Sequence, residues 1–208
     1  MEEGATLEVR WIRRGALTAP MVEWFGALGE DDETREDVYL VGESIRGLSV
    51  KIRGGAQLDL KVAQGTRGIL DVEGRAEGEI ESWQKWAFPL PSALAGDIAS
   101  PGWVTVRKIR HIRRFSHADV VPAERALDGI DAPWCAVELT DVSVDDEPWW
   151  TLGFEATGPA EALQGTIDAA AALVFGDRIP DTEELTAADS TSYTDWLRTR
   201  LPGGARHG

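Results

Sequence analysis

Cysteine, histidine and long apolar runs are scarce in this chain, and each shortage excludes a class of protein. The 208 residues include one cysteine, Cys135, so an internal disulfide is impossible and a reducing compartment is suitable. The three histidines are scattered, and no Cys/His spacing indicates zinc, so any metal would be held by carboxylates. No apolar run is long enough to span a membrane. The N-terminal M-E-E-G-A-T lacks the basic and apolar regions of a signal peptide, and we therefore expect a cytoplasmic protein.

Basic residues are also in the minority. The chain has 21 lysines and arginines against 36 acidic residues, a formal net charge of -15, which argues against nucleic-acid or anionic-membrane binding. The basic residues nevertheless gather in strand-like segments: W-I-R-R, V-K-I-R and V-R-K-I-R-H-I-R-R. We therefore expect a local cationic site within a negative surface. The nine tryptophans give no functional indication and are expected to pack in the core.

Alternation of apolar and polar residues predicts about eight mostly antiparallel strands followed by helices, which is an α+β fold with a dominant sheet or barrel. A charged loop is expected over Gly29–Glu36, and the C-terminal helices over Pro159–Phe175 and about Ser190–Arg200. We expect a single domain over residues 1–200 and a disordered tail over 201–208. The strands are expected at Thr6–Arg13, Asp37–Val41, Leu48–Arg53, Leu58–Val62, Glu77–Phe88, Trp103–Phe115, Trp134–Val142 and Trp149–Ala156.

The segment L-S-V-K-I-R-G-G-A-Q-L-D-L-K-V, Leu48–Val62, raises the question of what its polar face meets. Gly54 and Gly55 predict a tight turn between two strands. Because side chains alternate faces along a strand, one face is apolar and the other carries Lys51, Arg53 and Lys61. A solvated outer face would explain any one such strand.

Nearly every predicted strand, however, carries charges of both signs on one face. Eight strands are enough to close into a barrel with this face inward. Such a lining is costly unless the charges pair or a charged ligand fills the barrel. Lysine and arginine bind phosphate oxygens, and carboxylates bind the divalent cation that accompanies polyphosphate. The pattern therefore favours an anionic, metal-bridged ligand.

An ordered series of short motifs over residues 5–200 resembles the CYTH superfamily, the triphosphate tunnel metalloenzymes. The matching motifs are T-L-E-V-R (Thr6, Glu8, Arg10), D-V-Y (Asp37, Tyr39), V-K-I-R and L-K (Lys51, Arg53, Lys61), R-A-E-G-E (Arg75, Glu77, Glu79, with Glu79/Glu81 an equally good frame), V-R-K-I-R (Lys108, Arg110), F-E (Glu155) and S-Y-T-D-W-L (Tyr193).

The resemblance implies an eight-stranded antiparallel tunnel that binds triphosphate groups with Mg2+ or Mn2+. Known activities of the family include tripolyphosphatase, thiamine triphosphatase, RNA triphosphatase and adenylate cyclase. By this resemblance Glu8 and Glu155 are catalytic residues that hold the metal, with Glu77 and Glu79 as further metal ligands. The implied phosphate-binding residues are Arg10, Lys51, Arg53, Lys61, Lys108 and Arg110.

The sequence departs from the family pattern at the carboxylates. Thr6 replaces the first glutamate of the opening motif, Arg10 replaces its lysine, and Gly153 stands where the last strand has another glutamate. Two carboxylates one residue apart on a strand can share a divalent cation, so each loss weakens the metal site. The phosphate-binding residues are better preserved than the metal-binding ones.

Three hypotheses remain open at this stage. The first is a phosphohydrolase in which a metal-polarised water attacks the terminal phosphorus of a triphosphate. The second is a non-catalytic module of the same fold that binds a polyphosphate, a nucleotide or another phosphorylated molecule. The third uses the tryptophans, in a barrel for an apolar ligand or in a protein-interaction scaffold. The sequence does not determine the oligomeric state.

Overall fold

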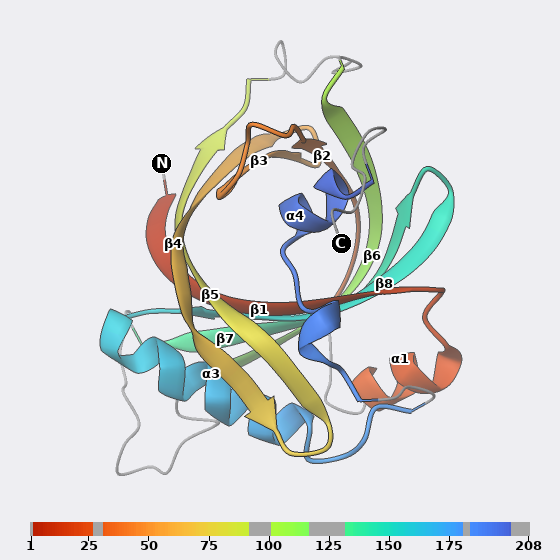
Figure 1. The fold of residues 1–208 in the computed structure, drawn as a ribbon, viewed down its shortest axis with the longest axis vertical. Coiled ribbons are helices and arrows are strands. Elements are labelled where there is room, and N and C mark those ends of the chain that lie inside the picture. The colour runs from red at the N-terminus through yellow and green to blue at the C-terminus, as the bar shows by residue number, and fades with distance from the viewer. Residues whose placement is uncertain (1, 27–30, 92–100, 117–131, 181–183, 201–208) are drawn as a thin grey trace.

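Eight antiparallel strands close into a barrel in a computed structural model that describes residues 2–26, 31–91, 101–116, 132–180 and 184–200. Around the barrel the order is β1-β5-β4-β3-β2-β6-β7-β8 (Figure 1). This confirms the predicted α+β fold with an eight-stranded antiparallel barrel; the tail, 201–208, lies outside the described residues. The strands are β1 (Glu2–Arg14), β2 (Asp31–Leu40), β3 (Leu48–Arg53), β4 (Gln57–Val72), β5 (Ala76–Pro89), β6 (Trp103–Ser116), β7 (Trp134–Val144) and β8 (Glu147–Thr157).

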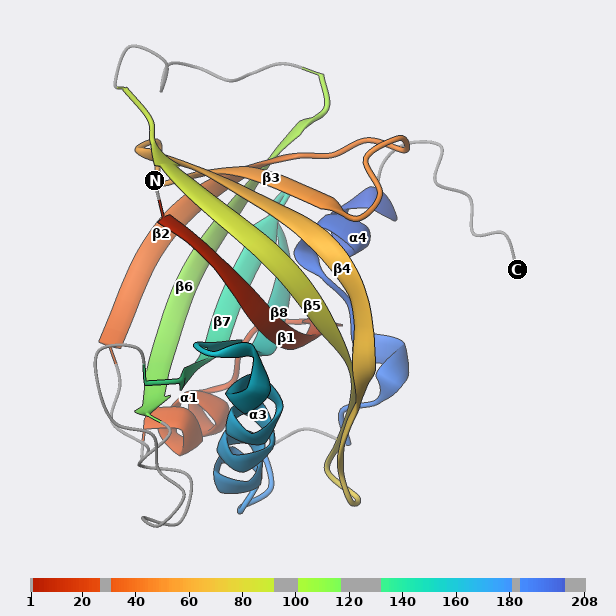
Figure 2. The same ribbon diagram turned by 90° about the vertical axis from the view of Figure 1, so that its left-hand side faces the viewer.

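The helices lie outside the barrel wall or over one of its ends (Figures 1 and 2). They are α1 (Ala19–Gly26), α3 (Ala160–Val174), the short 3-10 helix η3 (Ala187–Asp189) and α4 (Tyr193–Arg198). Helix α4 is shorter than predicted because Ser192 caps it: its Oγ accepts a hydrogen bond from the Asp195 N–H at 3.2 Å. No helix in the described ranges has the length and apolar character needed to cross a membrane.

The charged loop predicted over Gly29–Glu36 is wrong for the part that the structure describes. Asp31–Glu36 belong to β2, which pairs with β6 along its whole length. Glu33 and Arg35 alternate with exposed residues, and both enter ion pairs on the inner face of the barrel. Strand signals rest on apolar alternation. A strand whose inner face is charged lacks that signal. Strand β4 also continues to Val72, well past its predicted end, through an exposed stretch with two glycines and two register shifts that interrupt the alternation.

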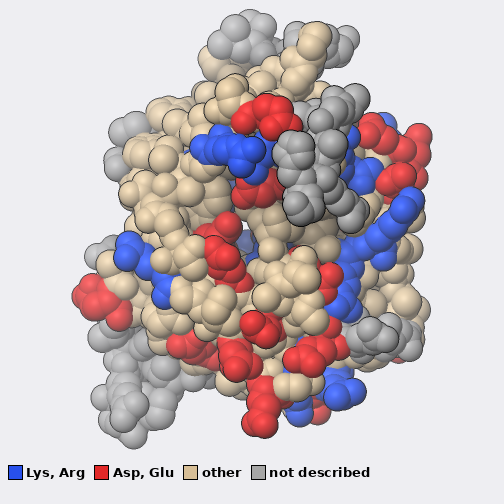
Figure 3. All heavy atoms as spheres, viewed as in Figure 1, with Lys and Arg blue, Asp and Glu red and all other residues tan. Residues whose placement is uncertain are grey.

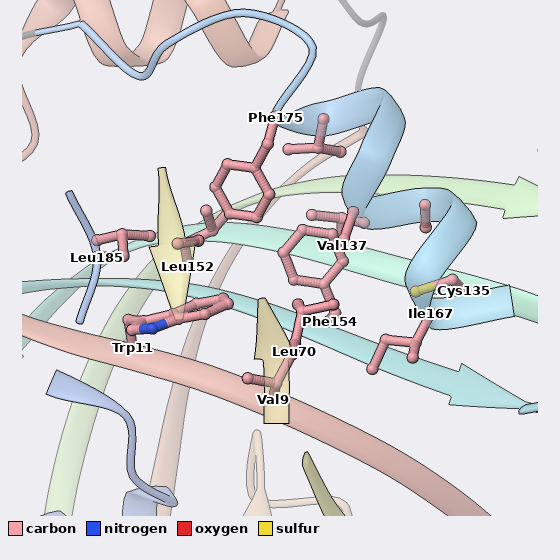
Figure 4. Close-up of a cluster of buried hydrophobic side chains, with 14 of the residues drawn as sticks. Val9, Trp11, Leu70, Cys135, Val137, Leu152, Phe154, Ile167, Phe175 and Leu185 are labelled. Carbon is pink, nitrogen blue, oxygen red and sulfur yellow. The ribbon is translucent and has the colours of Figure 1, made fainter. Parts of the chain in front are cut away.

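The larger apolar cluster lies outside the barrel, between its wall and helix α3 (Figure 4), and a smaller one packs around Trp196 and Leu197 of α4. Outward-facing Val9 and Trp11 of β1 pack in the larger cluster with Phe154 of β8 and Ile167 of α3. The Trp11 ring meets Phe154 edge to face, with centroids 6.2 Å apart. Because alternate side chains take opposite faces, this arrangement sends the polar residues of the same strands into the lumen.

Two of the short hairpins use left-handed backbone conformations at consecutive residues. Gly54 and Gly55 join β3 to β4 with φ of 53° and 69°, as predicted for the glycine pair. Asp145 and Asp146 join β7 to β8 with φ of 53° and 61°, a conformation that aspartate tolerates better than most residues. These turns fix the register, and therefore which charges face inward.

Candidate functional site

The lumen contains a cavity of about 80 Å3 whose lining is mostly charged. Five acidic side chains line it: Glu8, Asp59, Glu81, Glu138 and Glu155. Figure 3 shows acidic side chains around a small central opening, with basic atoms visible deep inside it. Seven basic side chains line it as well: Arg10, Arg35, Lys51, Arg53, Lys61, Lys108 and Arg110. The cavity lining therefore has more basic than acidic residues, although the protein as a whole is acidic.

The structure brings most of the predicted site residues together. All six predicted phosphate-binding residues line the cavity, and so do the two predicted catalytic residues, Glu8 and Glu155. Glu79 lies in a neighbouring recess of about 260 Å3, which shares Arg10 and Glu81 with the cavity. Glu77 is exposed and is not part of either lining; its backbone N–H donates to the Leu185 carbonyl at 2.7 Å.

Asp37 of β2 is the buried centre of the cationic wall. Its side chain is fully buried and accepts a hydrogen bond from Lys108 Nζ at 3.0 Å. Arg35 Nε lies 2.9 Å from the same carboxylate, and Lys51 Nζ lies 3.7 Å away. Burial alone would raise the pKa of Asp37, but Lys108, Lys51 and Arg35 together hold this pKa well below its ordinary value.

Two lysines of this wall have lowered pKa values because burial disfavours their charged form. Lys51 Nζ is 3.6 Å from Asp59 and 3.7 Å from Asp37, both beyond hydrogen-bonding distance. Desolvation therefore keeps the pKa of Lys51 well below its ordinary value. Desolvation also lowers the pKa of Lys108 to about 8, although this lysine donates to Asp37 and to the Tyr39 hydroxyl at 2.8 Å. Burial therefore disfavours the charged form of both lysines, and an anion beside them would favour it.

On the opposite side Lys61 of β4 bridges two carboxylates. Glu8 and Glu155 are direct register partners on β1 and β8, so two like charges face each other. Lys61 Nζ lies 2.5 Å from Glu8 and 3.2 Å from Glu155, and Lys85 adds a contact of 3.5 Å to Glu155. Burial acts to raise the pKa of Glu155, but Lys61 and Lys85 outweigh it and lower this pKa to about 2.

Arg10 fills the space opposite Gly153. A Cβ at Gly153 would lie 2.5 Å from Arg10 Cζ, so this guanidinium occupies the volume that a side chain would need. Arg10 donates to Thr151 at 3.0 Å, pairs with Glu138 at 3.5 Å and lies 4.9 Å from the centre of the Tyr193 ring. The glycine and the arginine are therefore structurally coupled.

Replacing Gly153 with alanine is expected to destabilise the protein by about 1–3 kcal/mol, because the new methyl group overpacks the site and pushes Arg10 away from Glu138. Urea denaturation of the two proteins measures the difference. Gly165→Ala is the matched control, since a Cβ there meets nothing within 4 Å and alanine favours its helix. A Gly153→Ala variant as stable as wild type would show that Arg10 does not depend on the glycine.

Two further carboxyl groups of the lining, Glu138 and Glu81, have pKa values shifted in opposite directions. Burial would raise the pKa of Glu138, but Arg110 and Arg10 outweigh it and hold the pKa well below its ordinary value. Arg110 also pairs with Glu33 of β2. Glu81 has no such compensation: burial raises its pKa to about 7, although the Trp83 Nε1–H donates to it at 3.2 Å. Glu81 therefore exchanges a proton near neutral pH, at the boundary between the cavity and the recess.

No protein-family model and no curated protein sequence matches this chain. Three solved structures show a distant similarity to this chain. A conserved hypothetical protein from Pyrococcus furiosus has a TM-score of 0.45 at 15% identity, over 90% of this chain and 98% of that one. The PH1012 protein of Pyrococcus horikoshii has a TM-score of 0.43 at 16% identity, over 90% and 98%. The Pct1 RNA triphosphatase of S. pombe, solved in complex with the Spt5 CTD, has a TM-score of 0.40 at 10% identity, over 84% and 80%. These similarities are too distant to assign a function.

The carboxylates as arranged do not fit a site for Mg2+ or Mn2+. Such ions need several oxygen ligands converging on one point. Among the described residues, no three acidic, histidine or cysteine side chains are grouped in that way. Glu8 and Glu155 face Lys61, and Glu138 faces Arg110 and Arg10. The volume opposite Gly153 is taken by the Arg10 guanidinium.

Sequence reasoning did not select several residues of this site. Arg35 was assigned to a loop, although its spacing of two from Asp37 placed it on the same face. Tyr193 stacks on Tyr39 with centroids 5.6 Å apart and closes one end of the lumen, and Lys108 Nζ lies 3.9 Å from the centre of its ring. The motif S-Y-T-D-W-L includes Tyr193, but nothing in that motif predicts the stacking on Tyr39. Glu81 belongs to the alternative alignment of the acidic motif, in which Glu79 and Glu81 take the places of Glu77 and Glu79.

Proposed function

We propose that the lumen binds a phosphorylated small molecule or a polyphosphate, through the cations of β3, β4 and β6. The observation that carries this proposal is the position of Lys51. Its side chain is only 13% exposed, and within the described part of the chain its nearest carboxylates, Asp59 and Asp37, lie 3.6 and 3.7 Å away, beyond hydrogen-bonding distance. A buried ammonium without a hydrogen-bonded counter-ion is costly, and a bound anion would supply one.

The charge of the lining supports an anionic ligand. Seven basic residues line the cavity against five acidic ones, while Asp37 and Glu33 supply two further carboxylates that pair with the same cations from outside the lining. Arg53 and Arg110 offer planar donor groups suited to phosphate oxygens, and Lys51 and Lys108 act as compact charges. An apolar ligand would leave Lys51 without a hydrogen-bonded counter-ion, which disfavours the third hypothesis from the sequence.

Phosphate hydrolysis is the second candidate function, and Glu81 is the observation that favours it. A carboxyl group with a pKa of about 7 at the cavity edge can accept a proton from water near neutral pH. In a metal-dependent form of this reaction, Mg2+ or Mn2+ would be held by Glu8, Glu155, Glu77 and Glu79. Lys61 would first have to leave its partners Glu8 and Glu155.

Calorimetric titration with orthophosphate, pyrophosphate and tripolyphosphate tests the binding proposal. We expect one binding site whose affinity rises with the charge of the ligand and falls with salt concentration. A parallel assay for released orthophosphate separates the two candidate functions. Absence of binding by all three anions at low salt would contradict the proposal.

Binding of tripolyphosphate is also expected to weaken with rising pH. Lys108 loses its charge above pH 8, because its pKa is about 8. We expect affinity to fall by about tenfold between pH 7 and pH 9, relative to a Lys108→Arg variant that keeps its charge. The ratio of the two proteins' affinities at each pH removes the effect of the ligand's own ionisation, because both proteins meet the same ligand. Parallel pH profiles for the two proteins would show that Lys108 does not hold the anion.

A further inference from the structure

The acidic side of the lumen already contains cations of its own. Lys61 Nζ lies within 3.2 Å of an oxygen of both Glu8 and Glu155, and it is itself only 14% exposed. Its ammonium thus hydrogen-bonds both facing carboxylates at once and lies between them as their counter-ion.

Arg10 is a second internal counter-ion, one inward-facing position further along β1. Arg10 and Gly153 are register partners, and the guanidinium lies directly over the glycine. There it compensates Glu138. Lys61 and Arg10 thus occupy successive levels of the lumen, at Glu8/Glu155 and at Arg10/Gly153. A carboxylate at 153 would need the space that Arg10 fills.

We propose that Lys61 and Arg10 are built-in counter-ions that take the place of a divalent metal, so that this lumen binds phosphorylated ligands without metal. The ligand half of this inference rests on the proposed function; the metal half does not. A divalent cation placed between Glu8 and Glu155 would meet the Lys61 ammonium at contact distance, and the two positive charges repel. Removing Lys61 should therefore uncover a metal site that the wild-type protein lacks.

Mn2+ titration followed by electron paramagnetic resonance tests the metal half, because free and bound Mn2+ differ in signal. We expect Lys61→Gln to bind Mn2+ with an affinity at least about tenfold higher than wild type. Mn2+ should also raise the melting temperature of this variant, by replacing the lost charge between its carboxylates. Lys85→Gln is the matched control: it also removes an amine near Glu155 but leaves Lys61 in place, and it should behave like wild type.

Calorimetry with tripolyphosphate tests the ligand half, once with a chelator and once with Mg2+. We expect equal or tighter binding in the chelator, since Mg2+ lowers the charge of the free ligand. Stoichiometric Mn2+ binding by wild type, or tripolyphosphate binding only with Mg2+, would overturn the inference. If tripolyphosphate fails to bind in both conditions, the proposed function falls while the Mn2+ result still decides the metal half. If Lys61→Gln does not fold, the two wild-type titrations decide alone.

Discussion

Replacing Asp37 with asparagine is expected to lower the free energy of unfolding by about 3–5 kcal/mol, because it leaves buried cations without their shared counter-ion. The carboxylate is fully buried, and Lys108 and Arg35 lie 3.0 and 2.9 Å from it. Asparagine keeps the shape of the side chain and removes its charge. The loss therefore reports electrostatic compensation rather than packing.

Denaturation by urea at several pH values measures this effect. The folded-state pKa of Asp37 is below its ordinary value of 3.8, so its contribution is fully present above that pH and is lost as pH falls through the lowered pKa. The gap between wild type and Asp37→Asn should therefore narrow on acidification. Asp71→Asn, an exposed site on β4, should change stability by less than about 0.5 kcal/mol. A similarly small change for Asp37→Asn would contradict the account.

Replacing Lys51 with glutamine is expected to weaken tripolyphosphate binding by about 30-fold or more, the loss typical of removing one partner of a buried charge pair. Stability should change much less, because the Lys51 ammonium is desolvated and lies 3.6 and 3.7 Å from its nearest carboxylates. Loss of binding with an unchanged melting temperature would distinguish a ligand-binding residue from a structural one.

Arg107→Gln is the matched control for this variant. Arg107 is on β6 beside Lys108 but faces outward, with its side chain 66% exposed. Its removal lowers the net charge of the protein by the same amount without changing the lumen. We expect its affinity for tripolyphosphate to remain within about threefold of wild type, since exposed charges contribute little. Equal losses in both variants would point to non-specific attraction in place of a site.

The sequence predicts the lumen well because a strand has a period of two. Once Leu48, Val50 and Ile52 are assigned to the outer face, Lys51 and Arg53 must point inward. The same reasoning fails for β2, where Glu33 and Arg35 alternate with other polar residues and no apolar face marks the strand. Interior charge is thus readable only where the outer face is apolar.

The pairing within the lumen could not be predicted. Lys61 meets Glu8 and Glu155 only because β4, β1 and β8 face one another across the closed barrel, and no local pattern encodes that distance. The motif comparison expected carboxylates where Thr6 and Gly153 stand, but no local pattern indicated that Arg10 occupies the space beside Gly153. Tyr193 reaches Tyr39 from a helix that packs on the barrel end. Such contacts depend on closure of the whole sheet.

Phosphorus-31 nuclear magnetic resonance of tripolyphosphate mixed with the wild-type protein, in a chelator at low salt, tests the central claim most directly. It reports binding and cleavage in one experiment, because bound ligand and released orthophosphate give separate changes in the spectrum. We predict that the tripolyphosphate signals shift or broaden until one equivalent is bound, and that Lys51→Gln reduces the change at the same protein concentration. Signals that remain sharp and unshifted at equimolar protein would contradict the claim that this lumen is a phosphate-binding site.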